Sequence, residues 1–197
     1  MSNSQINTSV FVKSSPKIGL CPTPDKPEFA FIGRSNVGKS SLINALTDNS
    51  KLAKISSKPG KTKLINHFLI NNQWYLVDLP GYGWAKVSKT EKSTWEGMIK
   101  DYLTQRESLV TVFLLIDIRL DPQPIDLNFI EWLGINQVPF TIVFTKKDKI
   151  GKTKAQSSVA TYKRTLKKTW EELPPMLVTS SHTKEGISEL LNYINSI

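Results

Sequence analysis

The sequence predicts an α/β fold, in which a mostly parallel sheet carries helices on both faces. Short apolar runs alternate with segments of helical period along the chain, from Glu28–Ile32 to Glu185–Ile194. One run, Leu109–Ile116, is apolar almost throughout, as expected for a strand that is buried on both faces. With 197 residues, of which 39% are apolar and 22% charged, the chain is large enough to bury one core.

The amino-terminal half is expected to hold a strand, a glycine loop with a helix, and a hairpin. Apolar composition predicts the strand Glu28–Ile32, and a helix over Lys39–Leu46 opens directly after the loop. Ser50–Lys63 is rich in Ser, Lys, Pro and Gly and has no apolar period, which predicts a long loop. The turn-forming Asn71-Asn72 lies between Leu64–Ile70 and Trp74–Val77, so we expect these two strands to form an antiparallel hairpin.

The carboxyl-terminal half continues the alternation of helices and strands. The helices are expected at Thr90–Leu103, Pro124–Leu133, along the helically spaced apolar residues from Val159 to Trp170, and at Glu185–Ile194. The strands are expected at Leu109–Ile116, Phe140–Phe144 and Met176–Val178. Residues 1–27 are polar and proline-bearing, which predicts an amino-terminal arm before a single domain over residues 28–197. In such folds ligands bind beyond the carboxyl ends of the strands, where we therefore expect the functional motifs.

The first motif is Gly33–Ser40, which matches G-x-x-x-x-G-K-[ST] between a strand and a helix and predicts a three-layer P-loop NTPase. Gly33 and Gly38 let backbone N–H groups turn toward phosphate oxygens, and the helix amino terminus adds partial positive charge. Lys39 is expected to reach the β- and γ-phosphates, and the Ser40 hydroxyl is expected to bind Mg²⁺.

Two further apolar runs end in an aspartate that can supply a carboxylate on the metal side, Asp78 and Asp117. Asp78 continues as Asp78-Leu79-Pro80-Gly81, where the Gly81 N–H can contact a γ-phosphate and so register its presence. Nothing comparable follows Asp117, which we interpret as a polar cap on a strand end. Asp78 is therefore favoured, acting on the metal through water.

Thr145-Lys146-Lys147-Asp148 follows the strand Phe140–Phe144 and suits recognition of a base. A carboxylate here can accept hydrogen bonds from both N1–H and N2–H₂ of guanine, while the lysine stem lies along the ring. Adenine has no such pair of donors. Two hydrogen bonds of about 1.5–3 kcal/mol each discriminate by at least about a hundredfold. The order of the motifs therefore favours GTP and GDP as ligands.

The chain resembles the translation-factor-like P-loop GTPases in five motifs: GRSNVGKSS, SKPGKT, DLPGYG, TKKD and TSSHTKEG. Within that class, FVKSSPKIGLCPTPDKPEFAF, SKPGKT and DLPGYGWAKVSK resemble the EngB (YihA/YsxC) family of bacterial GTP-binding proteins. The resemblance implies a Ras-like G domain with a six-stranded sheet and one antiparallel edge hairpin. It also implies slow, Mg²⁺-dependent GTP hydrolysis, a role in assembly of the large ribosomal subunit, and a requirement in normal cell division and septation.

Carried over by position, the resemblance assigns residues to the nucleotide and the metal. Mg²⁺ would be held by Ser40 and Thr62, and by Asp78 through water. The nucleotide-binding residues would be Gly33, Arg34, Ser35, Asn36, Val37, Gly38, Lys39, Ser40 and Ser41 in the phosphate loop, Gly60, Lys61, Thr62, Lys63 and Leu64 in switch I, Asp78, Leu79, Pro80 and Gly81 at the start of switch II, Thr145, Lys146, Lys147 and Asp148 in the base loop, and Thr179, Ser180 and Ser181 in the last loop. A backbone N–H of that last loop would bind the guanine O6.

Catalytic contacts are expected from Lys39, Thr62, Gly81 and Asn36. Asn36 resembles the asparagine that binds an activating K⁺ in related GTPases, and the alternative is that it only shapes the loop. Many GTPases place Gln directly after the glycine of the second motif, whereas this chain has Tyr82, so slow intrinsic turnover is expected.

Three further observations concern these loops. Thr145 stands where the broader pattern has Asn, which leaves open how the neighbouring loops are bonded. Arg34 and Arg119 are conceivable arginine fingers in cis, but neither spacing argues for that role, and a solvated surface arginine is the favoured alternative. His67 and His182 have no ligand spacing, and we assign them neither metal binding nor catalysis.

The net charge of +9 favours a polyanionic partner, either nucleic acid or an anionic membrane face. The resemblance implies that this partner is the large ribosomal subunit or its precursor, with its rRNA and ribosomal proteins. Positive charge is concentrated in Lys146–Lys154 and Tyr162–Lys168, and a solvated surface is the alternative. Tyr82, Trp84 and Lys86 could stack on RNA bases or dock on a protein, and packing of Trp84 in the core is an equal alternative. The other readings are a GTP-gated module of the division machinery that binds no RNA, and an ATPase or small-molecule kinase.

The remaining expectations concern location and assembly. The one cysteine, Cys21, suits a reducing compartment, and no apolar run is long enough to span a bilayer. The sequence therefore predicts a cytoplasmic monomer without stable membrane insertion.

Overall fold

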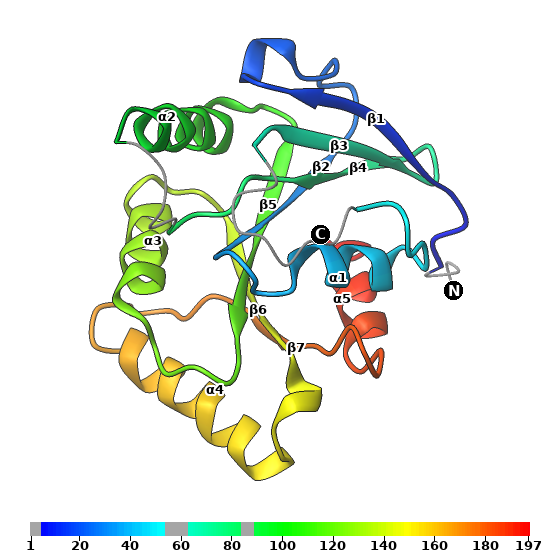
Figure 1. The fold of residues 1–197 in the computed structure, drawn as a ribbon. Coiled ribbons are helices and arrows are strands. Elements are labelled where there is room, and N and C mark those ends of the chain that lie inside the picture. Colours follow the sequence, from blue (N-terminus) through cyan, green and yellow to red (C-terminus); the bar gives the residue numbers. More distant parts are fainter. Residues whose placement is uncertain (1–4, 54–62, 84–88) are drawn as a thin grey trace.

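The computed structural model describes residues 5–53, 63–83 and 89–197, with side chains of the last range from residue 93 onward (Figure 1). The strands are β1 (Ser9–Ser15), β2 (Glu28–Gly33), β3 (Ile65–Ile70), β4 (Trp74–Asp78), β5 (Leu109–Asp117), β6 (Phe140–Thr145) and β7 (Met176–Val178). The α-helices are α1 (Lys39–Leu46), α2 (Lys89–Gln105), α3 (Pro124–Ile135), α4 (Lys152–Leu166) and α5 (Ile187–Ile194). The short 3₁₀ helices are η1 (Ile18–Leu20) and η2 (Lys147–Lys149).

The strands form one sheet in the order β1-β3-β4-β2-β5-β6-β7. β2 pairs in parallel with β4 and β5, and the parallel pairing continues through β6 to β7. β3 runs antiparallel to both β1 and β4. The α/β class, the mostly parallel sheet and the β3–β4 hairpin are confirmed, but the sheet has seven strands rather than the expected six.

The additional strand, β1, lies in the segment that was expected to be an arm. Ser9–Ser15 pairs with β3 and forms the edge of the sheet, with a register shift between Phe11 and Lys13. Val10, Phe11 and Val12 are all exposed, so the segment shows no alternation of buried and exposed apolar residues. The division of the chain at residue 28 stays a prediction, although the part before it contributes to the same sheet.

Helices cover both faces of the sheet and divide the core into two clusters. α1 and α5 lie together on one face, where Leu42, Ile43 and Leu190 pack against Phe31 and Phe113. α2, α3 and α4 lie on the other face, and their core residues include Tyr102, Ile130 and Tyr162. None of the helices among the described residues is long and apolar enough to cross a membrane.

α4 ends earlier than the apolar spacing predicts. The helix closes at Leu166, and Trp170 lies beyond it, with its ring packed edge-on against Phe140 at 5.6 Å between centroids. The ring also fills the space beside Gly134, where an added Cβ would lie 2.5 Å from the indole. Trp170 therefore packs against the same side of the sheet as α4, although it lies beyond the end of the helix.

A buried polar network ties the amino end of β2 to α2. The Glu28 carboxylate accepts hydrogen bonds from the Tyr102 hydroxyl at 2.5 Å and from the Arg106 Nε at 3.1 Å, and it lies 3.4 Å from His67 Nε2. Arg106 also donates to the Pro22 carbonyl at 2.7 Å. Burial raises the pKa of Glu28, but the bonds from His67, Arg106 and Tyr102 outweigh it and lower the pKa to about 2.

This network predicts a pH-dependent stability. Because the folded pKa of Glu28 lies below the ordinary value of 4.5, its contribution is full above that value and is lost as the pH falls toward 2. A shift of this size corresponds to about 3 kcal/mol. We expect Glu28→Gln to lower the free energy of unfolding by about that amount at pH 7. Urea denaturation between pH 7 and pH 3 should show the gap between wild type and variant closing, and a constant gap would contradict this.

Candidate functional site

The phosphate loop joins β2 to α1 at the centre of the sheet. A Cβ added to Gly33 would lie 2.8 Å from the Leu115 carbonyl oxygen and 2.9 Å from Val37 Cγ1, so only glycine fits. Gly38 has φ of 102° and is the residue that directly precedes α1. The two glycines of the motif thus allow the tight approach to β5 and the entry into the helix.

Lys39 and Asp78 form a buried ion pair across the loop. Lys39 opens α1 and Asp78 ends β4, and their side chains are 9% and 5% exposed. The Lys39 ammonium donates to Asp78 Oδ1. Asp78 is therefore the carboxylate that pairs with the lysine of the phosphate loop, while its role on the metal side stays a prediction. The oxygen donors of Asp78 and Ser40 are of the kind that Mg²⁺ binds.

Asp117 lies at the end of β5 and joins the phosphate loop to the base loop. It accepts bonds from Arg119 Nη2 at 2.7 Å and from Lys146 Nζ at 2.9 Å. Burial raises the pKa of Asp117, but these two cations lower it to about 2. Lys146 also donates to the Asn36 carbonyl at 2.6 Å. Asp117 therefore does more than cap a strand, because it fixes the lysine of the base loop against the phosphate loop.

Thr145 supplies a bond between the same two loops. Its hydroxyl donates to the Val37 carbonyl oxygen at 2.7 Å, and the side chain is buried. The bonding that was left open when Thr replaced Asn is therefore present, at least toward the phosphate loop.

We expect Thr145→Val, which keeps the shape but removes this bond, to weaken GDP binding about fivefold, since a neutral hydrogen bond contributes about 1 kcal/mol. The matched control is Thr141→Val on the same strand, where the buried hydroxyl bonds to Tyr193 at 3.2 Å instead. Titration with GDP would contradict the role of Thr145 if both variants bound equally well.

Asp148 is oriented by a residue from the last loop. Ser180 Oγ donates to Asp148 Oδ1 at 2.8 Å, and this bond lowers the pKa of the Asp148 carboxyl. Lys149 Nζ, which lies 3.2 Å from Asp148 Oδ2, lowers the same pKa further. The backbone N–H groups of Thr179 and Ser180 bond to Phe144 and Glu185 carbonyls. Among the described residues the Ser181 N–H has no such acceptor, so it is the donor of the three that is available to a base.

The start of switch II turns along the phosphate loop toward α3. The Leu79 N–H donates to the Phe31 carbonyl at 3.0 Å, and the Tyr82 N–H to the Gly33 carbonyl at 3.3 Å. The Tyr82 hydroxyl donates to Asp126 at 2.7 Å. This internal contact corrects the expectation that Tyr82 is available to stack on RNA.

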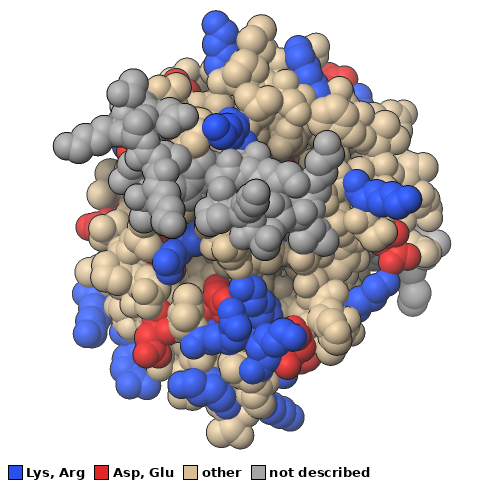
Figure 2. All heavy atoms as spheres, in the orientation of Figure 1, with Lys and Arg blue, Asp and Glu red and all other residues tan. Residues whose placement is uncertain are grey.

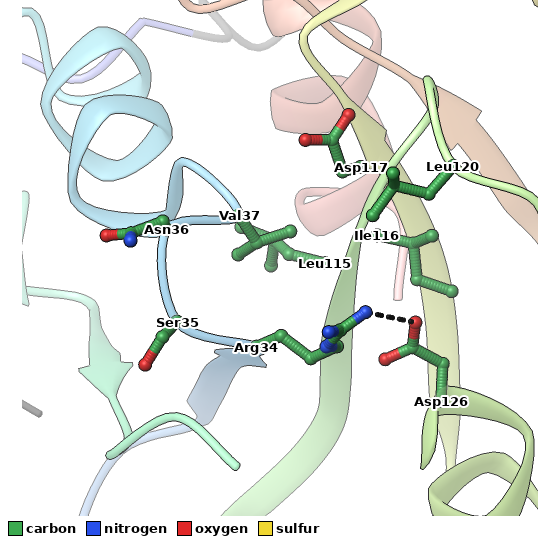
Figure 3. A pocket seen from close by; sticks show the side chains of 9 residues that line it. All are labelled: Arg34, Ser35, Asn36, Val37, Leu115, Ile116, Asp117, Leu120 and Asp126. Carbon is green, nitrogen blue, oxygen red and sulfur yellow. Dashed lines mark ion pairs between the residues drawn. The ribbon is translucent and has the colours of Figure 1, made fainter. Parts of the chain in front are cut away.

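Both candidate arginine fingers are held by carboxylates. Arg34 Nη1 lies 3.8 Å from Asp126 Oδ2, across a pocket beside the phosphate loop (Figure 3). Arg119 is paired with Asp117 through two nitrogens. Arg34 is partly buried, whereas Arg119 is exposed, with 43% of its side chain accessible, so Arg119 is a surface arginine as in the favoured alternative. Of the two histidines, His67 is fully buried beside Glu28 and far along the chain from His182.

Some expected residues cannot be placed. Gly60, Lys61, Thr62, Trp84 and Lys86 lie outside the described residues. At the carboxyl end of switch I, Leu64 is exposed, and the Lys63 ammonium lies 5.4 Å from the centre of the Trp95 ring on α2.

Sequence analysis did not identify Ser180 as the partner of Asp148, or Asp126 as a partner of Tyr82. Each contact joins residues more than thirty positions apart. No spacing rule connects them, because the pairs meet only when the strands align. The single available signal was Asp126 in the first turn of a helix that begins with Pro124.

Comparison with known proteins defines the class. The family model described as "50S ribosome-binding GTPase" matches residues 28–146. A solved structure of a probable GTP-binding protein engB superimposes with a TM-score of 0.70 at 23% identity, covering 86% of this chain and 97% of that one. The structure of Era in complex with MgGDPNP and part of 16S ribosomal RNA has a TM-score of 0.69 at 25% identity, over 86% of this chain and 56% of that one. The fold is that of a P-loop GTPase.

The sequence relatives specify the family. The probable GTP-binding protein EngB of Phocaeicola vulgatus is 55% identical over 193 residues, which cover 98% of this chain and 96% of the relative. The chain belongs to the EngB family of GTP-binding proteins.

Proposed function

We propose that this protein is a guanine-nucleotide switch that hydrolyses GTP slowly and acts in assembly of the large ribosomal subunit. The observation that supports the nucleotide site most directly is the convergence of Lys39, Asp78, Thr145 and Asp148 at the carboxyl ends of β2, β4 and β6. Membership of a GTP-binding family supports GTP and GDP as the ligands.

Each part of the site has one role in this proposal. The N–H groups of the phosphate loop hold the phosphates, and Lys39 turns from Asp78 to the β- and γ-phosphates. Asp148 accepts the two guanine donors, and the Ser181 N–H binds O6. Ser40, Thr62 and Asp78 would hold Mg²⁺, which neutralises charge on the phosphates when it is bound.

Slow turnover follows in this proposal from Tyr82. Its hydroxyl is bonded to Asp126 and its ring stacks on Phe129 at 4.6 Å, so it is not placed to orient a water. Asn36 is exposed and is our proposed ligand for an activating K⁺. GTP hydrolysis faster in KCl than in NaCl would support that role, and equal rates would contradict it.

A basic surface supports an RNA partner. Figure 2 shows Lys and Arg side chains gathered over the lower part of the molecule, where Figure 1 places α4 and the segment before it. Six cations on and directly after α4 are exposed and have no ion-pair partner among the described residues. They are Lys152, Lys154, Lys163, Arg164, Lys167 and Lys168. The helix dipole at the carboxyl end of α4 stabilises the positive charges of Lys163, Arg164, Lys167 and Lys168. These like charges also repel one another, and binding of an anionic partner would relieve that repulsion. We call these six residues the α4 basic face.

The ribosomal role is tested by cosedimentation with purified large subunits in GDPNP, the imido analogue of GTP, and in GDP. We expect more protein in the pellet with GDPNP. Lys163→Glu/Lys167→Glu should weaken this binding at least about tenfold, because several phosphate contacts are lost and repulsion is added. The control Lys13→Glu/Lys17→Glu makes the same charge change at exposed lysines elsewhere.

Equal effects of both double variants would contradict the α4 basic face as the contact. No pelleting in either nucleotide would favour the alternative, a GTP-gated protein module that does not bind RNA. A requirement in normal cell division and septation, a cytoplasmic location and a monomeric state remain proposals from the resemblance and the sequence.

A further inference from the structure

The turn at residues 78–82, here called the switch turn, is held at both ends but leaves one donor open. Leu79 and Tyr82 donate their N–H groups to the Phe31 and Gly33 carbonyls. Pro80 has no N–H, and the Gly81 N–H has no partner among the described residues. The open donor is thus the one beside the phosphate loop, between two fixed neighbours.

The exit of the switch turn is fixed by α3 as well as by the backbone. The Tyr82 ring stacks on Phe129, with 22° between the planes, and its hydroxyl donates to Asp126 Oδ1 at 2.7 Å. Asp126 is 3% exposed and belongs to the first turn of α3. A hydroxyl bonded to a buried carboxylate fixes the ring more firmly than stacking alone.

The same carboxylate also faces the phosphate loop. Arg34 directly follows Gly33, and its guanidinium lies 3.8 Å from Asp126 Oδ2 (Figure 3). A backbone bridge pairs Arg34 with Tyr82. One side chain of α3 therefore contacts both residues of this bridge.

We propose that Asp126 is a positioning residue for GTP: through Tyr82 it holds the switch turn so that the Gly81 N–H is ready for the γ-phosphate. This inference rests on the proposed function. It adds that α3, through Asp126, makes the site bind GTP in preference to GDP. Holding a donor in place lowers the ordering cost of the contact, and only the nucleotide with a γ-phosphate benefits.

The test is the ratio of the dissociation constants for GDPNP and GDP, measured by calorimetry on the full chain. Tyr82→Phe keeps the stack on Phe129 and removes the bond to Asp126. We expect GDPNP binding to weaken roughly tenfold, as for the loss of one hydrogen bond to a charged group, while GDP binding stays within about twofold.

Tyr102→Phe is the matched control. It removes another hydrogen bond from tyrosine to a buried carboxylate, that of Glu28 at the opposite end of β2. Both variants should lower the melting temperature, but only Tyr82→Phe should change the nucleotide ratio. Equal ratios in the two variants, or equal weakening of GDP and GDPNP by Tyr82→Phe, would overturn the proposal.

A double-mutant cycle tests the route through Asp126. Asp126→Ala should change the ratio as Tyr82→Phe does, and the two substitutions together should add little, because they break the same bond. Additive effects would overturn the coupling. If the wild type bound neither nucleotide, the proposed function itself would fail, and this inference with it.

Discussion

Asp148→Asn is expected to abolish the preference of the site for guanine. In place of a carboxylate that accepts from N1–H and N2–H₂, the variant presents an amide with one acceptor and one donor. GDP affinity should fall by at least about a hundredfold, since two charge-assisted bonds are affected. Xanthosine diphosphate, which carries a carbonyl at position 2, should bind the variant better than GDP does. Competition of GDP, ATP and xanthosine diphosphate against a fluorescent GDP measures the guanine preference and the affinities for GDP and xanthosine diphosphate.

The matched control for this change is Asp121→Asn, at an exposed carboxylate in the loop between β5 and α3. This variant should bind GDP as the wild type does. If Asp148→Asn kept its guanine preference, Asp148 would not be the residue that reads the base, and the bond from Ser180 would have only a structural role.

Lys39→Met is expected to affect both nucleotide binding and stability. The variant loses the cation for the β- and γ-phosphates, so GTP hydrolysis should fall at least about a hundredfold. It also leaves the buried Asp78 carboxylate unpaired, which should lower the free energy of unfolding without nucleotide by about 3 kcal/mol. Single-turnover hydrolysis and urea denaturation measure the two effects separately.

Adding Asp78→Asn to this variant isolates the stability effect of Lys39, since Asp78 is itself proposed to act on the metal. The double variant has no unpaired buried charge, so most of the stability should return, while hydrolysis should stay low. Recovery of hydrolysis together with stability would show that Lys39 acts only by pairing with Asp78, and that would contradict its contact with the phosphates.

The parts of the fold that sequence predicted well are those with a local signal. The helix Lys39–Leu46 and the strand Met176–Val178 have the expected bounds, because a glycine loop or a short apolar run marks them. The edge strand β1 has no such signal, since its pairing with β3 joins Ser9 to Ile70, and its apolar residues are exposed.

The candidate site divides in the same way. The motif residues could be predicted because phosphate and guanine chemistry require particular residue types at short spacing. The residues that hold them in place are distant in sequence: Asp117 binds Lys146, and Asp126 binds Tyr82. An aspartate that supports a neighbour has the same local pattern as one on the surface, so only the aligned strands and α3 reveal the role.

The central claim is that the site binds guanine nucleotides in preference to adenine nucleotides. The most direct measurement is calorimetric titration of the full wild-type chain with GDP, GDPNP and ATP in the presence of Mg²⁺. We predict that both guanine nucleotides bind at least about a hundredfold more tightly than ATP, as two hydrogen bonds to Asp148 require. Equal affinity for ATP would contradict the claim and would instead support an ATPase or kinase built on the same phosphate loop.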